Sequence, residues 1–257
     1  MPVLDLPEPA EWRRRRWLGP LLLVIGAGVA IGYGALGVVA TARASYLTAA
    51  VTSGFAVSTL LFIAALVPVM GGHTVERTRT DATGLTMVPD RRFTLLVTAA
   101  ILVALPSLVI FTVFAPLGRI DFATGRILQV AFPVLGAFAV IVTVAGLVTA
   151  WRRGGIGHVT LSPVMIENAD VLSVRRFEWD DVVDVVGHAE SKKASRAVVL
   201  RLRDGGEEVI GNANVYVRGG AALYWLVRHY WKHPEDRDEL VDARASKRWQ
   251  EGRFDVS

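Results

Sequence analysis

Four long stretches without a charged residue constrain this chain more than any other feature. None of them contains Asp, Glu, Lys, Arg or His, and they cover residues 17–42, 44–72, 93–118 and 127–151. A helix of about 20 apolar residues, rising 1.5 Å per residue, crosses a hydrocarbon core of about 30 Å. Buried helices of soluble proteins are usually shorter where they carry no charge. The sequence therefore predicts four transmembrane helices, at approximately 18–40, 47–70, 94–115 and 128–150.

The composition agrees with a membrane protein and narrows its chemistry. Hydrophobic residues make up 52% of the 257 residues and charged residues only 20%, below the roughly 25% of a typical soluble domain. The chain has no cysteine, which excludes disulfides, thiolate metal sites and cysteine nucleophiles. We expect no catalytic site, no metal and no cofactor, and therefore no enzyme.

The basic residues between the spans predict the orientation. Arginines 13–16, 77, 79, 91, 92, 152 and 153 lie on one side, and only arginines 43, 119 and 126 lie on the other. Because cytoplasmic loops carry the excess of Lys and Arg, both termini are expected in the cytoplasm. The predicted organisation is a cytoplasmic segment 1–16, a four-span domain 17–151 in the inner (plasma) membrane, and a cytoplasmic domain 152–257.

The last domain carries no excess of positive charge. From residue 152 onward, 17 Lys and Arg balance 17 Asp and Glu. A nucleic-acid-binding domain would need a basic surface of its own, so we expect no nucleic-acid partner. The expected partners are membrane lipids and other integral membrane subunits.

The N-terminal arginines allow two further interpretations. Arg13, Arg14, Arg15 and Arg16 precede an apolar stretch, as in a secretory signal with a cleavage site at residues 40–42. A signal's apolar region spans only about 7–15 residues, so a retained anchor is favoured. Together with Trp12 and Trp17, these arginines are also a candidate interface with anionic lipids, although topology alone already requires their charge.

Small residues recur at helical spacing within the first two spans. Gly28 and Gly32 form a GxxxG pair, Gly34 belongs to a neighbouring ridge, and Gly54 continues the pattern in the second span. Such residues let helix backbones approach closely in lipid. They predict packing among the four helices of this chain or docking onto the helices of another protein. Residues 32–37 also match GxGxxG, but inside a membrane span this cannot be a dinucleotide-binding turn.

The segments outside the membrane predict short strands followed by helices. The loop 73–92 has two β-branched runs, 74–80 and 85–88, on either side of a possible turn at 81–84, which predicts a hairpin. Beyond residue 155, alternation and turn residues predict strands and then two helices. The strands are expected near 158–161, 164–167, 172–177, 182–186, 197–203 and 208–210, and the helices at 221–230 and 234–250.

The segment Phe177-Glu178-Trp179-Asp180-Asp181-Val182, a glycine-containing hairpin and a closing amphipathic helix resemble bacterial pleckstrin-homology-like (PH-like) domains. The end of the chain, residues 230–237, is similar to the tails of actinobacterial multi-pass membrane proteins of this kind, and 24 Arg against 4 Lys agrees with such a source. The resemblance implies a small α+β domain of seven strands and a helix with a binding or scaffold role. Phe177, Trp179 and Asp180 are its candidate element. Residues 155–211 alone look one or two strands short, which the hairpin in 73–92 could supply.

Two groups of polar residues could in principle bind a metal or catalyse a reaction. His229 and His233 are four residues apart and could share a metal on a helix, but no third ligand is evident and the general-base Glu of zinc-hydrolase helices is absent. Glu178, Asp180, Asp181 and Asp184 form an acidic run that is more typical of a solvated strand edge than of acid–base catalysis.

The sequence thus favours a non-catalytic membrane protein that serves as an accessory, regulatory or scaffold subunit of a larger envelope complex. A lipid transporter is the most concrete example, with the PH-like domain binding a partner or a lipid headgroup. The alternative is a small oligomeric transporter or channel for a neutral or apolar solute, because spans without ionisable residues argue against proton or ion relays.

Overall fold

The computed structural model describes residues 6–15, 17–153, 155–171, 173–190 and 196–256. The chain divides into two compact units. The helical unit contains Leu18–Val67 and Thr94–Gly154, and the β unit contains Met1–Trp17, Pro68–Phe93 and Gly155–Ser257. The β unit is therefore built from three stretches of chain that the predicted spans separate in sequence.

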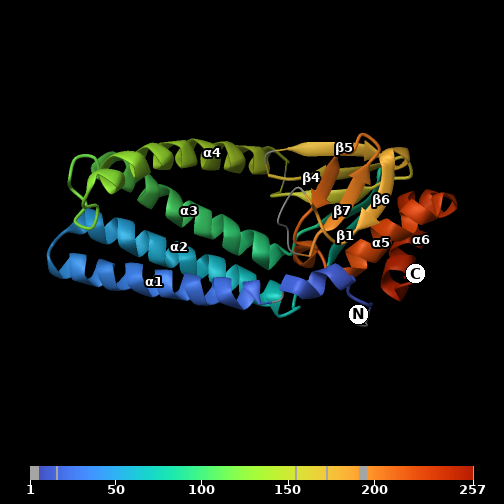
Figure 1. The fold of residues 1–257 in the computed structure, drawn as a ribbon, viewed down its shortest axis with the longest axis horizontal. Coiled ribbons are helices and arrows are strands. Elements are labelled where there is room, and N and C mark those ends of the chain that lie inside the picture. Colours follow the sequence, from blue (N-terminus) through green and yellow to red (C-terminus); the bar gives the residue numbers. More distant parts are fainter. Residues whose placement is uncertain (1–5, 16, 154, 172, 191–195, 257) are drawn as a thin grey trace. The chain divides into compact units, whose positions relative to one another are not determined.

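The helical unit consists of four helices that are long and apolar enough to cross a membrane. They are α1 (Leu18–Ala42), α2 (Tyr46–Met70), α3 (Arg91–Phe114) and α4 (Phe132–Arg153), shown in blue to yellow-green in Figure 1. Each covers one of the expected spans, because an uncharged apolar run satisfies its backbone hydrogen bonds internally only as a helix. The prediction of four helices of transmembrane length is confirmed.

A single π-helical turn, Ile127–Ala131, leads into α4. The backbone N–H of Phe132 donates to the carbonyl of Ile127, five residues earlier. Pro133 follows and has no N–H to donate to the preceding turn, so the wider turn forms where the regular α-helical ladder is already interrupted. The helix type thus changes at the start of α4.

The β unit contains a five-stranded antiparallel sheet in the order β1-β2-β3-β4-β5, here called sheet A. Its strands are β1 (Arg77–Asp81), β2 (Gly84–Val88), β3 (His158–Leu161), β4 (Met165–Ala169) and β5 (Val174–Glu178). The hairpin β1–β2 lies within the loop expected to hold one, and β2 pairs with β3 so that Thr86 lies opposite Thr160. The loop between two spans therefore supplies two strands to the sheet.

Gly84 permits this pairing. Its φ of +141° belongs to a region that L side chains rarely adopt, and a Cβ at this position would overlap the carbonyl oxygen of Leu161. Glycine is therefore required both for the turn and for the close approach of β3.

Side chains alternate across sheet A as in a sheet with one buried face. Leu85, Met87, Val159, Leu161 and Ile166 are at most 1% exposed and form the core face. On the opposite face, a cross-strand row runs through Thr86, Thr160, Glu167 and Arg176.

The remaining strands form a separate antiparallel sheet, sheet B, in the order β6-β7-β8. These strands are β6 (Val182–Val186), β7 (Val198–Leu202) and β8 (Glu207–Ile210). A 3-10 turn, Trp179–Asp181, joins β5 of sheet A to β6 of sheet B. The described residues thus form eight strands in two sheets, one more strand than the resemblance implies.

The chain ends in helices, but the expected helix over 234–250 is two elements. A 3-10 helix, Pro234–Val241, precedes α6 (Ala243–Glu251). Asp242 lies between them in an extended conformation, and its carboxylate accepts the N–H of Arg244 as an N-cap. A capping aspartate begins a new helix rather than continuing an old one, which explains why the prediction of one helix was wrong.

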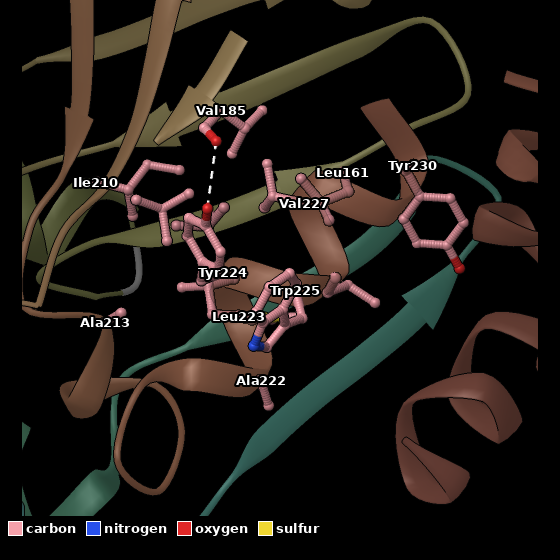
Figure 2. Close-up of a cluster of buried hydrophobic side chains, with 14 of the residues drawn as sticks. Leu161, Val185, Ile210, Ala213, Ala222, Leu223, Tyr224, Trp225, Val227 and Tyr230 are labelled. Atoms are coloured by element: carbon pink, nitrogen blue, oxygen red, sulfur yellow. Dashed lines mark hydrogen bonds between the residues drawn. The ribbon is translucent and has the colours of Figure 1, made fainter. Parts of the chain in front are cut away.

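The core of the β unit forms where α5 (Ala221–Lys232) packs on the sheets. Figure 2 shows Leu223, Trp225 and Val227 of α5 gathered with Leu161 of sheet A and Ile210 of sheet B. The hydroxyl of Tyr224 donates to the carbonyl of Val185 at 3.4 Å, the dashed line in Figure 2. Nearly all of α5 is buried, so this helix is the central element of the domain.

Candidate functional site

Some glycines of the predicted spans pack against a neighbouring helix of this chain, and others do not. A Cβ at Gly54 of α2 would overlap the hydroxyl of Ser107 on α3, and one at Gly136 of α4 would lie 2.6 Å from the hydroxyl of Thr112 on α3. A Cβ at Gly26 of α1 would lie 3.3 Å from Ile63 of α2. These glycines pack the helices of this chain against each other.

Gly28, Gly32 and Gly34 of α1 face open space. A Cβ at any of the three would meet no atom within 4 Å. The GxxxG pair is therefore not used for packing among the described helices, whereas Gly54 is. Of the two interpretations that the sequence left open, the structure assigns internal packing to Gly54, and docking of Gly28 and Gly32 onto another protein stays a prediction.

Trp12 lies inside the β unit, although its sequence position suggests the membrane interface. Its side chain is 6% exposed, and its Nε1 donates to the carbonyls of Gly187 (2.8 Å) and Ala197 (3.2 Å). Its ring contacts that of Tyr224 edge-on, with 6.0 Å between the centroids. An indole buried this way fixes the N-terminal segment to the domain and is not available to lipid headgroups.

The other members of the N-terminal candidate interface differ from Trp12. Trp17 is 63% exposed, as an aromatic residue at a membrane interface would be. The structure describes only the backbone of Arg13, Arg14 and Arg15, in a 3-10 helix at Ala10–Arg15, and Arg16 lies outside the described residues. A lipid-binding role for these four arginines stays a prediction.

The Phe177–Asp180 element forms the crossing between the two sheets. Trp179 is 2% exposed, its Nε1 donates to the carbonyl of Ser162 at 2.8 Å, and the guanidinium of Arg237 lies 4.9 Å from its ring centroid. Phe177 lies opposite Ile166 and is half-buried on the core face. The two aromatic side chains therefore hold the corner where the chain passes from sheet A to sheet B.

Asp180 differs from its aromatic neighbours because its side chain is 89% exposed. Its carboxylate lies 3.9 Å from Arg237, and its carbonyl accepts a hydrogen bond from Arg203 at 2.9 Å. An exposed ion pair of this kind contributes little to stability. The element is a structural corner, with Asp180 at its solvent side.

A cluster of buried and half-buried polar side chains lies between α5, the 3-10 helix Pro234–Val241 and α6. We call it the C-terminal polar cluster; it consists of His229, Tyr230, Asp236, Glu239 and Arg248. The side-chain ligand atoms of His229, Asp236 and Glu239 all lie within 4.8 Å of one another. Arg248 bonds both carboxylates, with Nη2 at 2.9 Å from Asp236 and 3.2 Å from Glu239.

The hydrogen bonds of the cluster fix its protonation. The backbone N–H of Asp255 donates to Nδ1 of His229 at 3.3 Å, so the proton of the neutral ring is on Nε2, facing Asp236 at 3.0 Å. Burial lowers the pKa of His229, and the positive charge of Arg248 acts in the same direction. Burial and the bond to Glu239 raise the pKa of Tyr230, which stays a hydroxyl donor at 2.8 Å.

This geometry fits an internal ion-pair network better than a metal centre. A metal held by His229, Asp236 and Glu239 would need the place that the guanidinium of Arg248 takes between the two carboxylates. His233 lies outside the cluster: its Nδ1 faces Glu235 at 3.1 Å and its Nε2 faces Asp255 at 3.4 Å. The histidine pair singled out by its spacing therefore has carboxylate partners within the chain.

Sequence reasoning missed Asp90, the residue before α3. It is 3% exposed, and its carboxylate accepts the N–H of Arg92 and of Val75, both at 2.7 Å. Its own N–H donates to the carbonyl of Val215 at 3.1 Å. An aspartate immediately before a helix is a typical N-cap, so the sequence held the signal for the cap but not for the other two bonds.

Comparison of the chain with protein-family models, with curated proteins and with solved structures finds no match.

Proposed function

We propose that this chain is a non-catalytic subunit of a larger envelope complex, anchored in the inner membrane by α1–α4. In this role the β unit is a PH-like binding module on the cytoplasmic side, and the spans dock beside the spans of other subunits. A lipid transporter is the kind of complex that such a subunit would serve. Docking by the spans and binding by the β unit are tested by separate experiments.

The observation that carries the proposal is the unpartnered GxxxG surface of α1. A Cβ at Gly28 or Gly32 would meet no atom of this chain within 4 Å, while Gly54 on α2 and Gly136 on α4 already face side chains of α3. Of the four helices, α1 is also the least buried within the chain: 11% of its most apolar 18-residue stretch is buried. Close approach of a second helix is the usual use of such a glycine pair in lipid.

The proposed role involves no catalysis, because the side chains that could react are either absent from the spans or already hydrogen-bonded. The apolar cores of the spans contain no Asp, Glu, Lys, Arg or His, and the buried histidine His229 is neutral and bonded on both ring nitrogens. Tyr230 is held as a hydroxyl donor to Glu239. These groups stabilise the domain and leave no nucleophile beside an available base.

The proposed orientation of the domain follows from the charge bias. Arg91 and Arg92 begin α3, and Arg152 and Arg153 end α4. Both pairs lie at the helix ends that connect to the β unit. By the positive-inside rule we therefore expect that unit in the cytoplasm.

The test is purification of the tagged full chain from native membranes in mild detergent. The expected result is co-purification of the same integral membrane proteins in repeated preparations. The variant Gly28→Leu with Gly32→Leu should lose those partners, whereas Val38→Leu, at a 72% exposed position of α1, should keep them. A wild-type chain that always emerges alone and monomeric would contradict the proposal.

The same preparation examines the alternative function. Purified chain in sealed vesicles that moves a neutral or apolar solute without any other subunit would favour a small oligomeric transporter or channel. Vesicles that stay tight to such solutes would agree with the subunit role.

A further inference from the structure

Four exposed arginines of the β unit lie at the start of α3 and on two segments that are hydrogen-bonded to Asp90, the residue before α3. Arg91 and Arg92 are in its first turn, Arg77 is the first residue of β1, and Arg218 lies in the loop before α5. All four side chains are exposed. They come from two of the three chain stretches that build the unit, so the fold brings them together.

Hydrogen bonds from the side chains and backbone of Asp90 and Thr74 hold the three segments together. Asp90 binds the N–H groups of Arg92 and Val75 and donates its own N–H to Val215. Next to Val75, the hydroxyl of Thr74 donates to the carbonyl of Asn214 at 2.7 Å. The start of α3, the segment before β1 and the segment before α5 therefore form one fixed surface.

Arg218 and Arg77 extend this surface on two sides. A Cβ at Gly72 would lie 3.7 Å from Nε of Arg218, which places that guanidinium against the segment leading to β1. Arg77 pairs with Val88 across the hairpin, two residues before Asp90. We call the surface formed by Arg77, Arg91, Arg92 and Arg218 the arginine collar.

The arginine collar differs in its partners from several arginines on the sheets. On the sheets, arginines form ion pairs: Arg175 with Glu208 at 3.4 Å, and Arg176 with Glu167 at 2.6 Å. Within the described parts of the chain, no ion pair joins a collar arginine to a carboxylate.

The two nearby carboxylates are committed elsewhere. Asp90 is buried and accepts backbone N–H groups, and Glu76 accepts the indole N–H of Trp249 at 3.1 Å. The four arginines outnumber these two carboxylates, so the collar keeps a surplus of positive charge. Such a surplus on a fixed surface suits an anion from outside the chain.

From this geometry we infer that the arginine collar binds the phosphate of an anionic phospholipid headgroup. The inference rests on the proposed function, because it takes α3 as a membrane span. The apolar run of α3 starts directly after Arg92, so the collar stands at the level where a span leaves the headgroup region. Guanidinium groups match phosphate oxygens in geometry and charge.

Topology alone does not account for the collar. The charge bias that orients a span acts through residues flanking it in sequence, which covers Arg91 and Arg92. Arg218 follows the end of α4 by more than sixty residues. Its position against Gly72, in the segment between α2 and β1, is a product of the tertiary fold, and Arg218 is therefore the residue that distinguishes a headgroup site from an orientation signal.

The experiment uses the full chain in detergent, titrated with phosphatidylglycerol or with phosphatidylcholine, and measures bound lipid by native mass spectrometry. We expect the wild type to bind phosphatidylglycerol preferentially. Arg218→Gln should weaken that binding about fivefold, the order expected for one basic residue at an anionic surface. Arg218→Lys should retain more of the binding than Arg218→Gln because it keeps the charge.

The matched control removes two arginines from the opposite ends of the spans. Arg119 and Arg126 are exposed, lie between α3 and α4, and belong to the helical unit. Arg119→Gln with Arg126→Gln should leave phosphatidylglycerol binding unchanged, although it removes twice the charge. Thermal melts of every variant in phosphatidylcholine confirm that the exposed substitutions preserve the fold.

Two results would overturn the inference. Equal weakening by Arg218→Gln and by the control pair would mean general attraction to any boundary arginine. Displacement of phosphatidylglycerol by inorganic phosphate at comparable concentration would mean a site for a soluble phosphate. Neither result bears on co-purification with other subunits, so failure of the lipid site and failure of the proposed function are separable.

Discussion

Replacing Trp12 by alanine separates the structural role of this residue from the interfacial role that its sequence position suggests. The side chain is 6% exposed and donates two hydrogen bonds to the backbone of the β unit. Truncating a buried tryptophan costs about 3–5 kcal/mol through lost burial and the cavity left behind. For a domain of about 150 residues, each kcal/mol lowers the Tm by roughly 2–4 °C. We therefore expect Trp12→Ala to lower the Tm of the β unit by about 10 °C.

Two further variants divide this loss into its causes. Trp12→Phe keeps a ring against Tyr224 but leaves the carbonyls of Gly187 and Ala197 without their donor, so it should cost about 1–3 kcal/mol. Trp17→Ala is the matched control, because Trp17 is 63% exposed and its loss should leave the fold within about 0.5 kcal/mol.

The assay is hydrogen exchange of the full chain in detergent, read at the amides of β7, combined with a thermal melt. Trp12→Ala should reduce the protection of β7, since Ala197 immediately precedes that strand. If Trp12→Ala left protection and Tm unchanged but loosened the attachment to lipid, the reasoning from burial would be refuted.

Two other predictions follow from the geometry of single residues. Gly54→Ala should destabilise the helical unit by about 1–3 kcal/mol, because the new methyl group overlaps α3, whereas Gly28→Ala, which faces open space, should leave a detergent melt unchanged. Burial depresses the pKa of His229 in the folded state, so as the pH falls below the ordinary value of 6.5 the unfolded state takes up the proton first. The stability present above pH 6.5 is then lost as the pH falls toward the folded-state pKa. His229→Gln, which keeps a donor for Asp236, should flatten that loss in chemical unfolding at pH 5–7, and a slope equal to that of the wild type would contradict it. The hydrogen bond to Glu235 raises the pKa of His233, so the stability that His233 contributes is present at low pH and is lost as the pH rises. The contribution of His229 is therefore taken from the difference in pH dependence between variant and wild type.

The helices of the predicted membrane part follow from local chemistry and were accessible to sequence reasoning. Each is an uncharged apolar run, and such a run has essentially one way to satisfy its backbone in lipid. The hairpin β1–β2 was accessible for a similar reason, because β-branched residues flank a turn that contains Gly84. In these segments the signal lies within a few neighbouring residues.

The candidate sites were less accessible because they depend on side-chain partners that residue spacing alone does not reveal. Spacing singled out His229 and His233, yet the structure joins His229 to Asp236 and Arg248 and pairs His233 with Glu235. The helix break at Asp242 was missed because a capping aspartate and a solvent-exposed helical aspartate look alike in sequence.

Sequence by itself determined the number of apolar helices, the bias of positive charge and the existence of strands in two separate regions. Tertiary structure alone decided that the loop between α2 and α3 completes sheet A, and that Trp12 is a core residue although Trp17 is exposed. It also decided that Gly54 is filled while Gly28 is open, and that Arg218 lies against Gly72 in the segment between α2 and β1. The physical reason is that local patterns encode backbone conformation and polarity, whereas burial and partnership depend on which distant surface arrives at a residue when the chain closes on itself.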